Sequence, residues 1–348
     1  MQFNDLQNMS ARTPVLPPTE EAIALAVARL SSAELVAFPT ETVYGVGADA
    51  SNPQAVVKLF TLKGRPADHP VIVHLAMTAP LDRWAAIVPD DARRLLAQFA
   101  PGALTLILRK SKYVPEVVTG GQDTVGLRFP SHPVSRRLLE AFGGGIAAPS
   151  ANRFGRVSPT TAAHVADEFG DRLPLILDGG PCAVGIESTI VDLSQGMAVL
   201  LRPGGVSAAL LAEALGYMPK QRTANSPRVS GALPSHYSPA TSTFLVPPSA
   251  LAIAAHEAAR AAKPVGVLAR SATRPADFRG LWRQAPFGAE GYARTLYAEL
   301  RLLDAAGLDV LLVEAPPEDT QWDAVNDRLR RATHSVVNRE ANSAPHQP

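Results

Sequence analysis

Apolar positions in the first 215 residues alternate between short β-branched runs and longer stretches with helical spacing. Ile23, Val27 and Leu30 stand at positions i, i+4 and i+7, which predicts a helix that Thr19 can cap. Short apolar runs are instead typical of buried strands. The expected elements are helices at 20–30, 52–62, 90–99, 133–142 and 161–169 and strands at 35–38, 71–75, 104–108, 125–129, 146–148, 175–177 and 190–193. Because strands and helices do not alternate regularly, we predict an α/β fold on an open, twisted, mixed sheet with flanking helices.

The pattern changes after residue 215. Residues 216–240 contain four prolines among Ser, Thr and Asn and show no apolar period, which predicts an extended, semi-stiff linker. From residue 241 the alternation of strands and helices is typical of a small Rossmann-like parallel α/β domain. Its expected elements are strands at 244–246, 265–268 and 311–313 and helices at 251–262, 292–306 and 322–332. We therefore predict domains at 1–215 and 241–337, joined by the linker 216–240 and followed by a disordered tail at 338–348.

Charge and composition exclude several classes of protein. The 33 Lys and Arg residues are balanced by 32 Asp and Glu, and residues 1–215 hold 18 basic against 20 acidic side chains. A strongly basic nucleic-acid coat protein needs a large excess of positive charge. The single cysteine, Cys182, excludes a disulfide within the chain and a multi-cysteine metal site.

The sequence contains no pattern that predicts insertion into a membrane. Its start lacks the cationic and apolar segments of a secretory signal. No apolar run approaches the roughly 18 residues that cross a bilayer. We therefore expect a cytoplasmic protein with no membrane contact.

Candidate chemistry lies in polar loops that follow predicted strands, where ligands bind in open α/β sheets. The sequence has no Walker-type G-x-x-x-x-G-K-[ST] run and no complete dinucleotide fingerprint. Residues 39–47 (PTETVYGVG) combine hydroxyls, a carboxylate and glycines, which suits a small polar ligand or an ordinary tight turn. Lys63 and Arg65 flank Gly64 and can hold phosphate oxygens, although cations are also favoured at any helix C-terminus.

Two polar residues interrupt apolar strands. Arg128 lies inside the strand 125–129, and a buried guanidinium needs an anionic partner, either a protein carboxylate or that of a ligand. His74 lies between Val73 and Leu75 and fits either a ligand contact or a satisfied core histidine. Further polar loops follow at 149–152, 187–191 and 202–205.

In order and spacing, these motifs resemble the YrdC-like domain of threonylcarbamoyl-adenylate synthases. The motifs that carry the resemblance are PTETVYGVG at 39–47, KGRP at 63–66, PSAN at 149–152, ESTIV at 187–191 and RPG at 202–204. The second half is similar to the domain appended in the two-domain members, through VEAPP at 313–317 and VNDRLRRA at 325–332. The resemblance therefore covers nearly the whole chain.

The resemblance implies a reaction and its partners. L-threonine, bicarbonate and ATP would give threonylcarbamoyl-AMP, pyrophosphate and water, which makes the chain a nucleotidyltransferase. The product would pass to a tRNA threonylcarbamoyl transferase complex that forms N6-threonylcarbamoyladenosine. Mg²⁺ would enter with ATP and without a dedicated protein cage, and a weak contact with tRNA is a further expectation.

The resemblance also assigns residues. Lys63 and Arg65 would be catalytic. The residues expected to bind L-threonine are Thr42, His74, Arg128, Ala148 and Ser188. The residues expected to bind the nucleotide are Arg65, His69, Thr124, Ser150, Asn152, Ser158, Arg202 and Tyr237. Ala148 stands where relatives often have Thr or Ser, so it can offer only its backbone.

Two other functions remain open. One is a module of the same fold that binds double-stranded RNA or tRNA without synthase activity, which the near-neutral charge of residues 1–215 disfavours. The other is carbamoyl transfer, as in larger proteins with added cysteine clusters, which Cys182 alone cannot supply. For the linker, the resemblance implies a lid over the first domain with Tyr237 against the nucleotide; a solvated tether is the alternative.

Overall fold

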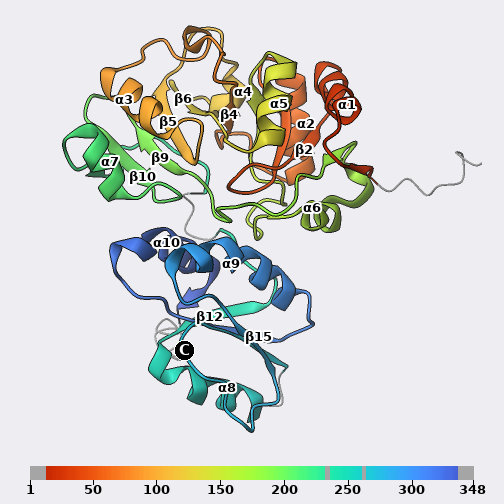
Figure 1. The fold of residues 1–348 in the computed structure, drawn as a ribbon, viewed down its shortest axis with the longest axis vertical. Helices are drawn as coiled ribbons and strands as arrows, with labels where there is room; N and C mark the ends of the chain where they lie inside the picture. The colour runs from red at the N-terminus through yellow and green to blue at the C-terminus, as the bar shows by residue number, and fades with distance from the viewer. Residues whose placement is uncertain (1–12, 232–235, 261–263, 336–348) are drawn as a thin grey trace, which may run out of the picture. The chain divides into compact units, whose positions relative to one another are not determined.

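The computed structural model describes residues 13–231, 236–260 and 264–335, which form two compact units (Figure 1). Unit 1 comprises Met1–Phe154, Ser158–Ala183 and Glu187–Ser230. Unit 2 comprises Gly155–Val157, Val184–Ile186 and Gly231–Pro348. Across the described ranges, no helix is both long and apolar enough to cross a membrane.

The helices of unit 1 begin and end at residues suited to those positions. Asn52 caps α2 by accepting hydrogen bonds from the Gln54 and Ala55 backbone N–H groups at 3.0 and 3.3 Å. Gly64 ends α2 in the left-handed conformation, with φ of 64°, directly after Lys63. The described α-helices are α1 (Glu20–Ser31), α2 (Pro53–Lys63), α3 (Asp90–Phe99), α4 (Glu116–Thr119), α5 (Pro133–Phe142), α6 (Ala162–Phe169) and α7 (Ala208–Leu215).

The strands of unit 1 form one mixed sheet, which confirms the predicted fold class. Its order is β1-β8-β2-β3-β7-β4-β6-β5-β9-β10-β11, with parallel and antiparallel pairs. The strands are β1 (Val15–Leu16), β2 (Val36–Phe38), β3 (Gly45–Asp49), β4 (Ile72–His74), β5 (Leu104–Arg109), β6 (Thr124–Arg128), β7 (Ile146–Ala147), β8 (Ile176–Leu177), β9 (Thr189–Asp192), β10 (Val199–Arg202) and β11 (Lys220–Gln221). Helices pack on both faces, so side chains of β2 alternate between two cores, with Ala37 in one and Val36 and Phe38 in the other.

The structure differs from the sequence prediction at β3 and β10. Residues 45–47 belong to the predicted polar loop 39–47, but in the structure they begin β3, which pairs antiparallel with β2 and β7. Gly47 is required there, since an added Cβ would lie 2.6 Å from the Ile146 side chain and 2.8 Å from Phe38. Arg202, expected as a cation before a glycine turn, is the last residue of β10, a strand that the sequence analysis did not predict. β3 pairs with its chain neighbour β2 and with the distant β7, whereas β10 pairs with its chain neighbours β9 and β11.

The strand register aligns a row of residues across the middle of the sheet. Residues paired on neighbouring strands point to the same face. The row runs from β4 to β10 through His74, Arg128, Thr105, Ile190 and Arg202. Four polar side chains from four strands are therefore brought to one face of the sheet.

Unit 2 is a parallel α/β fold, as predicted. Every pairing in its sheet is parallel, in the order β14-β13-β15-β12-β16. Helix α8 covers one face of this sheet, and α9 and α10 cover the other (Figure 1). The elements are β12 (Ser242–Val246), α8 (Leu251–Arg260), β13 (Val265–Ala269), β14 (Leu281–Gln284), α9 (Ala289–Asp304), β15 (Val310–Glu314), α10 (Asp323–Ala332) and β16 (His334–Ser335).

The segment predicted as a linker, 216–240, is divided between the two units: residues 216–230 belong to unit 1, and the rest belongs to unit 2. It is therefore not a free tether. Residues 220–221 form β11 against β10, and the Arg228 backbone N–H donates to Gln122 Oε1 at 2.8 Å. In unit 2 the His236 backbone N–H donates to the Arg331 carbonyl at 3.1 Å. The tail predicted at 338–348 lies outside the described residues.

Candidate active site of unit 1

The loop between β2 and β3 is folded around the Thr40 hydroxyl. This hydroxyl donates to the Val43 carbonyl at 2.6 Å and accepts from the backbone N–H groups of Thr42 and Val43, both at 3.2 Å. The Thr42 hydroxyl lies 2.8 Å from it, and both threonines are buried. The loop is therefore a tight turn that also keeps two hydroxyls inside the molecule.

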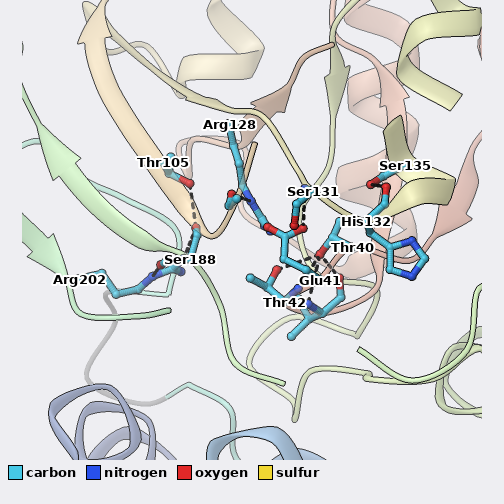
Figure 2. Close-up of polar contacts among 12 residues, drawn as sticks. Thr40, Glu41, Thr42, Thr105, Arg128, Ser131, His132, Ser135, Ser188 and Arg202 are labelled. Atoms are coloured by element: carbon cyan, nitrogen blue, oxygen red, sulfur yellow. Dashed lines mark hydrogen bonds and ion pairs between the residues drawn. The ribbon is translucent and has the colours of Figure 1, made fainter. Parts of the chain in front are cut away.

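Arg128 and Glu41 form a buried ion pair at the end of β6 (Figure 2). Arg128 donates to Glu41 Oε1 at 2.7 Å, and the Ser131 backbone N–H donates to Glu41 Oε2 at 3.0 Å. Burial raises the pKa of Glu41, but the Arg128 charge and these hydrogen bonds outweigh it, so the pKa lies below its usual value. The sequence left two partners open for Arg128, and the structure provides the carboxylate from the protein.

His74 lies beside Arg128 in the register of β4 and β6 and is almost fully buried. Burial, together with the Arg128 charge, lowers the pKa of His74 to about 3, so the imidazole is neutral at physiological pH. Its Nδ1 has no hydrogen-bond partner within the described ranges. A satisfied core histidine would have one, whereas an open nitrogen beside a cation suits a polar ligand.

Ser188 joins Thr105 and Arg202 at the next strands of the row (Figure 2). Its hydroxyl lies 2.7 Å from the Thr105 hydroxyl. Arg202 donates to the Ser188 carbonyl at 2.9 Å and to its hydroxyl at 3.3 Å. Another guanidinium nitrogen of Arg202 donates to the Ser230 carbonyl at 2.8 Å. Arg202 thus fixes both the ESTIV loop and the last residue of unit 1.

Lys63 connects the C-terminal end of α2 to the PSAN loop. Its ammonium donates to the Ser150 carbonyl at 2.6 Å and to the Asn152 carbonyl. Burial and the neighbouring Arg65 charge hold the pKa of Lys63 well below its usual value. The lysine therefore holds the PSAN backbone in place, and its own backbone carbonyl accepts from Phe154 at 2.8 Å.

Arg65 and His69 lie around the Phe154 ring. Arg65 donates to the Pro70 carbonyl at 2.7 Å, and its guanidinium carbon lies 5.6 Å from the ring centre of Phe154. The His69 ring meets the same ring edge to face at 5.2 Å. Partial burial and the Arg65 charge lower the pKa of His69. The two residues are thus neighbours, as their shared nucleotide assignment requires.

Three further candidates lie outside the polar row. Thr124 begins β6, about 13 Å from Arg128 at the strand's rise per residue. The Ala148 backbone N–H is already used, because it donates to the Ile72 carbonyl at 3.0 Å. The Ser158 hydroxyl donates to Glu187 Oε1 at 2.7 Å. The structure therefore does not bring every predicted residue into one cluster.

Tyr237 belongs to unit 2. Its ring stacks on Tyr297 with centres 5.7 Å apart, and the buried Arg328 guanidinium carbon lies 5.3 Å from its centre. Its φ of 62° is unusual for a residue with a side chain. The nucleotide contact of Tyr237 and the lid stay predictions.

Glu41, Thr105 and Glu187 take part in these contacts but were not among the predicted site residues. Glu41 and Glu187 stand inside motifs that the sequence singled out. Thr105 interrupts the apolar run 104–108 in the same way that Arg128 interrupts its strand. A polar residue inside a buried strand was therefore the signal that could have identified it.

No three His, Cys, Asp or Glu side chains gather into a potential metal site anywhere in the described ranges. A divalent ion that binds mainly through substrate phosphates needs at most one or two protein carboxylates. Entry of Mg²⁺ together with a nucleotide is compatible with this site.

Two family profiles match the chain. The first, described as "Telomere recombination", covers residues 28–204, and the second, described as "Threonylcarbamoyl-AMP synthase, C-terminal domain", covers residues 206–334. The chain is 39% identical to the threonylcarbamoyl-AMP synthase of Pyrococcus abyssi over 90% of its own length and 94% of that protein. It is 37% identical to the Bacillus subtilis protein of the same name, over 93% and 96% of the two chains.

A solved structure supports the same relationship. The crystal structure of P. abyssi Sua5 complexed with L-threonine superposes with a TM-score of 0.84 at 37% identity. The match covers 90% of this chain and 96% of that one. Both units are therefore included in the similarity.

Proposed function

The chain belongs to the threonylcarbamoyl-AMP synthase family, and from this membership we propose how its residues perform the reaction. The enzyme is a nucleotidyltransferase that forms threonylcarbamoyl-AMP for the modification of tRNA. The chemistry first joins the threonine amine to bicarbonate, with loss of water, to give a carbamate. A carbamate oxygen then attacks the α-phosphorus of ATP, and pyrophosphate leaves. No covalent bond to the protein is needed, so the protein's task is to bind, orient and stabilise charge.

The observation that carries the proposal is the pairing of His74 and Arg128 on adjacent strands. Arg128 binds the threonine carboxylate with donors that Glu41 leaves available, and Glu41 offsets part of the guanidinium charge. Neutral His74 directs its open Nδ1 to a donor group of the amino acid. A zwitterion presents a carboxylate and an ammonium close together, which matches a cation beside an acceptor.

Further threonine contacts come from small side chains at the two ends of this pair. Thr42 and Ser188 are buried and offer hydroxyls. Ala148 offers a methyl group, because its backbone N–H is already bonded.

The nucleotide binds through the cations and the PSAN loop. Arg65 and Arg202 supply guanidinium groups for phosphate oxygens, and Lys63 supplies positive charge beneath the PSAN backbone. In this proposal Lys63 and Arg65 stabilise charge on the reacting phosphate. The remaining nucleotide contacts are His69, Thr124, Ser150, Asn152, Ser158 and Tyr237.

Mg²⁺ enters with ATP in this proposal and neutralises part of the phosphate charge when it is bound. The partners are therefore ATP with its metal ion, L-threonine and bicarbonate. The product is a mixed anhydride that a tRNA threonylcarbamoyl transferase complex consumes, and a weak contact with tRNA is included in the proposal.

The test is pyrophosphate release by the full chain with ATP, Mg²⁺ and bicarbonate, with each amino acid added in turn. We expect release that depends on threonine, together with an acid-labile threonylcarbamoyl-AMP peak in chromatography. Serine, which lacks the methyl group, is the matched control and should be used far less efficiently. The proposal would be falsified if pyrophosphate release were equal with every amino acid, or if it were the same when no amino acid is added.

A further inference from the structure

Unit 2 contains a group of polar and aromatic residues that the synthase reaction does not use. They lie where β13 and β15 end, next to the start of α9. The chain leaves β13 toward the edge strand β14, but it leaves β15 through α10 toward β16 on the opposite side of the sheet. Ligands of parallel α/β sheets bind where the direction of the connections reverses in this way.

Glu314, at the end of β15, fixes the loop after β13. Its carboxylate accepts from the backbone N–H groups of Arg270 at 2.7 Å, Ser271 at 2.9 Å and Ala272 at 3.0 Å, and from the Ser271 hydroxyl. Burial raises the pKa of Glu314, but these donors outweigh it, so the pKa lies below its usual value. Both carboxylate oxygens of Glu314 therefore already accept hydrogen bonds from this loop, and the role of Glu314 is to hold Arg270 in position.

The Arg270 guanidinium lies between two aromatic rings and not against a carboxylate. Its central carbon is 4.5 Å from the Phe287 ring centre and 5.5 Å from that of Trp322. Its Nε is buried and has no hydrogen-bond partner in the part of the chain that the structure describes. Within the same residues, the Arg270 side chain has no ion pair. A half-buried cation with unused donors is suited to an anion from solution.

Tyr292 adds a second unused donor. It is fully buried on the first turns of α9, its hydroxyl has no partner among the described residues, and its ring meets Trp322 edge to face at 5.4 Å. Burial raises the pKa of this phenol, the Glu314 charge adds to the rise and the Arg270 charge opposes it. A buried hydroxyl without a partner costs free energy unless a ligand or water completes it.

The start of α9 supplies further donors beside Arg270. Gly288 precedes the helix without a side-chain hydrogen bond to its first turn. The backbone N–H groups of that turn have no partner within the helix, and the helix dipole favours an anion there. Phe287, directly before Gly288, brings the Arg270 guanidinium to this helix end.

We propose that Arg270, Tyr292 and the N-terminal turn of α9 form a binding site in unit 2 for a phosphate-bearing anion. The phosphate could be free or part of a nucleotide, because the exposed Phe287 ring offers a surface on which a base can stack. This site is additional to the proposed active site, which lies entirely on other residues.

The test uses the full chain and inorganic phosphate, with potassium chloride at equal ionic strength as the comparison. The readout is the indole N–H signal of Trp322 in ¹H–¹⁵N spectra, because this ring contacts both Arg270 and Tyr292. We expect a saturable shift of the Trp322 signal with phosphate and none with chloride. The signal of Trp84, which lies in unit 1, reports any binding there.

Variants test whether the phosphate-dependent shift arises from binding at this site. Arg270→Gln should abolish the phosphate-dependent shift, whereas Arg279→Gln, at an exposed arginine, should keep it. Tyr292→Phe should weaken phosphate binding by about tenfold or more, the value of a hydrogen bond to a charged group. In phosphate-free buffer the same variant should melt at or above the wild-type temperature, because it removes an unsatisfied hydroxyl.

The proposal is overturned if phosphate does not shift the Trp322 signal, or if the shift survives in Arg270→Gln. Should Arg270→Gln not fold, Tyr292→Phe decides: a lower melting temperature with unchanged phosphate binding means that the hydroxyl holds structural water. Adenosine monophosphate identifies the source of the phosphate. Tighter binding of this nucleotide, lost in Phe287→Leu, assigns a nucleotide, and equal binding assigns free phosphate.

Discussion

At the scale of single residues, the site depends on how charges are compensated. Arg128 is buried on a central strand and would be costly to keep charged without Glu41. Glu41 in turn is kept ionised by Arg128 and the Ser131 backbone N–H. The pair is a fixed cation of reduced net charge, which in the proposed function binds the threonine carboxylate and releases it again after reaction.

Arg128→Gln should raise the KM for threonine by about 10- to 150-fold, since a hydrogen bond to a charged group contributes about 1.5–3 kcal/mol. The KM for ATP should change little, because the lost partner is the amino-acid carboxylate. Steady-state pyrophosphate release measures both constants. Arg109→Gln, on the exposed end of β5, is the control and should leave both unchanged. An equal loss for both substrates would contradict the assignment.

His74 should make stability depend on pH. Its pKa is about 3 in the folded chain and about 6.5 when unfolded, so the unfolded chain binds an extra proton between these values. His74 therefore destabilises unit 1 as the pH falls below about 6.5, by about 1.4 kcal/mol per pH unit. Native-state hydrogen exchange of β6 amides between pH 6.5 and 5.5 measures the slope.

His74→Asn should reduce this slope, because the extra proton-binding group of the unfolded chain is gone. His256→Asn should not reduce it, since that half-buried histidine in unit 2 has a raised pKa, which acts with the opposite sign. A slope in His74→Asn that equals the wild-type slope would mean that His74 titrates normally.

At the scale of elements, loops are held by single buried charged residues. Lys63 at the end of α2 fixes the PSAN loop, and Glu314 at the end of β15 fixes the loop 270–272. In both cases one side chain satisfies several backbone groups that would otherwise be buried without partners. Substitution of the buried charged residue should therefore destabilise each loop more than substitution of a side chain within the loop itself.

Lys63→Met keeps the length of the side chain and removes its donors. We expect unit 1 to fold with a loss of about 1–3 kcal/mol, because the Ser150 and Asn152 carbonyls lose a buried partner. Synthesis should fall further than stability, since the PSAN loop is proposed to bind ATP. Thermal melting and pyrophosphate release are the measurements, and Lys58→Met, an exposed lysine on the same helix, is the control.

Glu314→Gln should destabilise unit 2 by about 1–3 kcal/mol or more, because an amide cannot accept from four donors without turning an N–H toward one of them. Hydrogen exchange of β13 and β15 should report the loss, while β4 and β6 in unit 1 keep their protection. Glu318→Gln, on an exposed neighbour, should have no effect. Uniform loss of protection in both units would contradict independent stabilisation.

At the scale of the whole molecule, the boundary between the units decides where the chain can be cut. Residues 216–230 complete unit 1, since β11 extends its sheet and Ser230 accepts from Arg202. The two segments 155–157 and 184–186 are grouped with unit 2 although the chain on both sides of each segment belongs to unit 1. Their Val157 carbonyl accepts a hydrogen bond from Arg301.

A fragment that ends at Ser230 should therefore melt at a higher temperature than one that ends at Leu215. The shorter fragment loses the hydrogen bond from Arg202 to the Ser230 carbonyl and the hydrogen bonds between Gln122 and Arg228. Calorimetry of the two fragments measures the difference. Equal melting temperatures would show that residues 216–230 do not contribute to unit 1.

The sequence by itself determined the local structure and the family of this protein. Thr19, which the sequence predicted as a helix cap, caps α1 in the structure by accepting from the Ala22 backbone N–H through its side-chain hydroxyl. Apolar periodicity located most strands. The order of strands and helices predicted a mixed sheet in the first domain and a parallel sheet in the second. The motifs identified the synthase family, because they group residue types whose chemistry the reaction needs.

Only the tertiary structure decided which of these residues meet. The row from His74 to Arg202 depends on a register between strands that lie up to 128 residues apart in sequence. Glu41 became the partner of Arg128, whereas Arg270 has no carboxylate partner among the residues that the structure describes, and no local pattern encodes either outcome. Strand pairing and charge compensation are set by packing between distant segments, whereas caps and periodicity are set within a few residues.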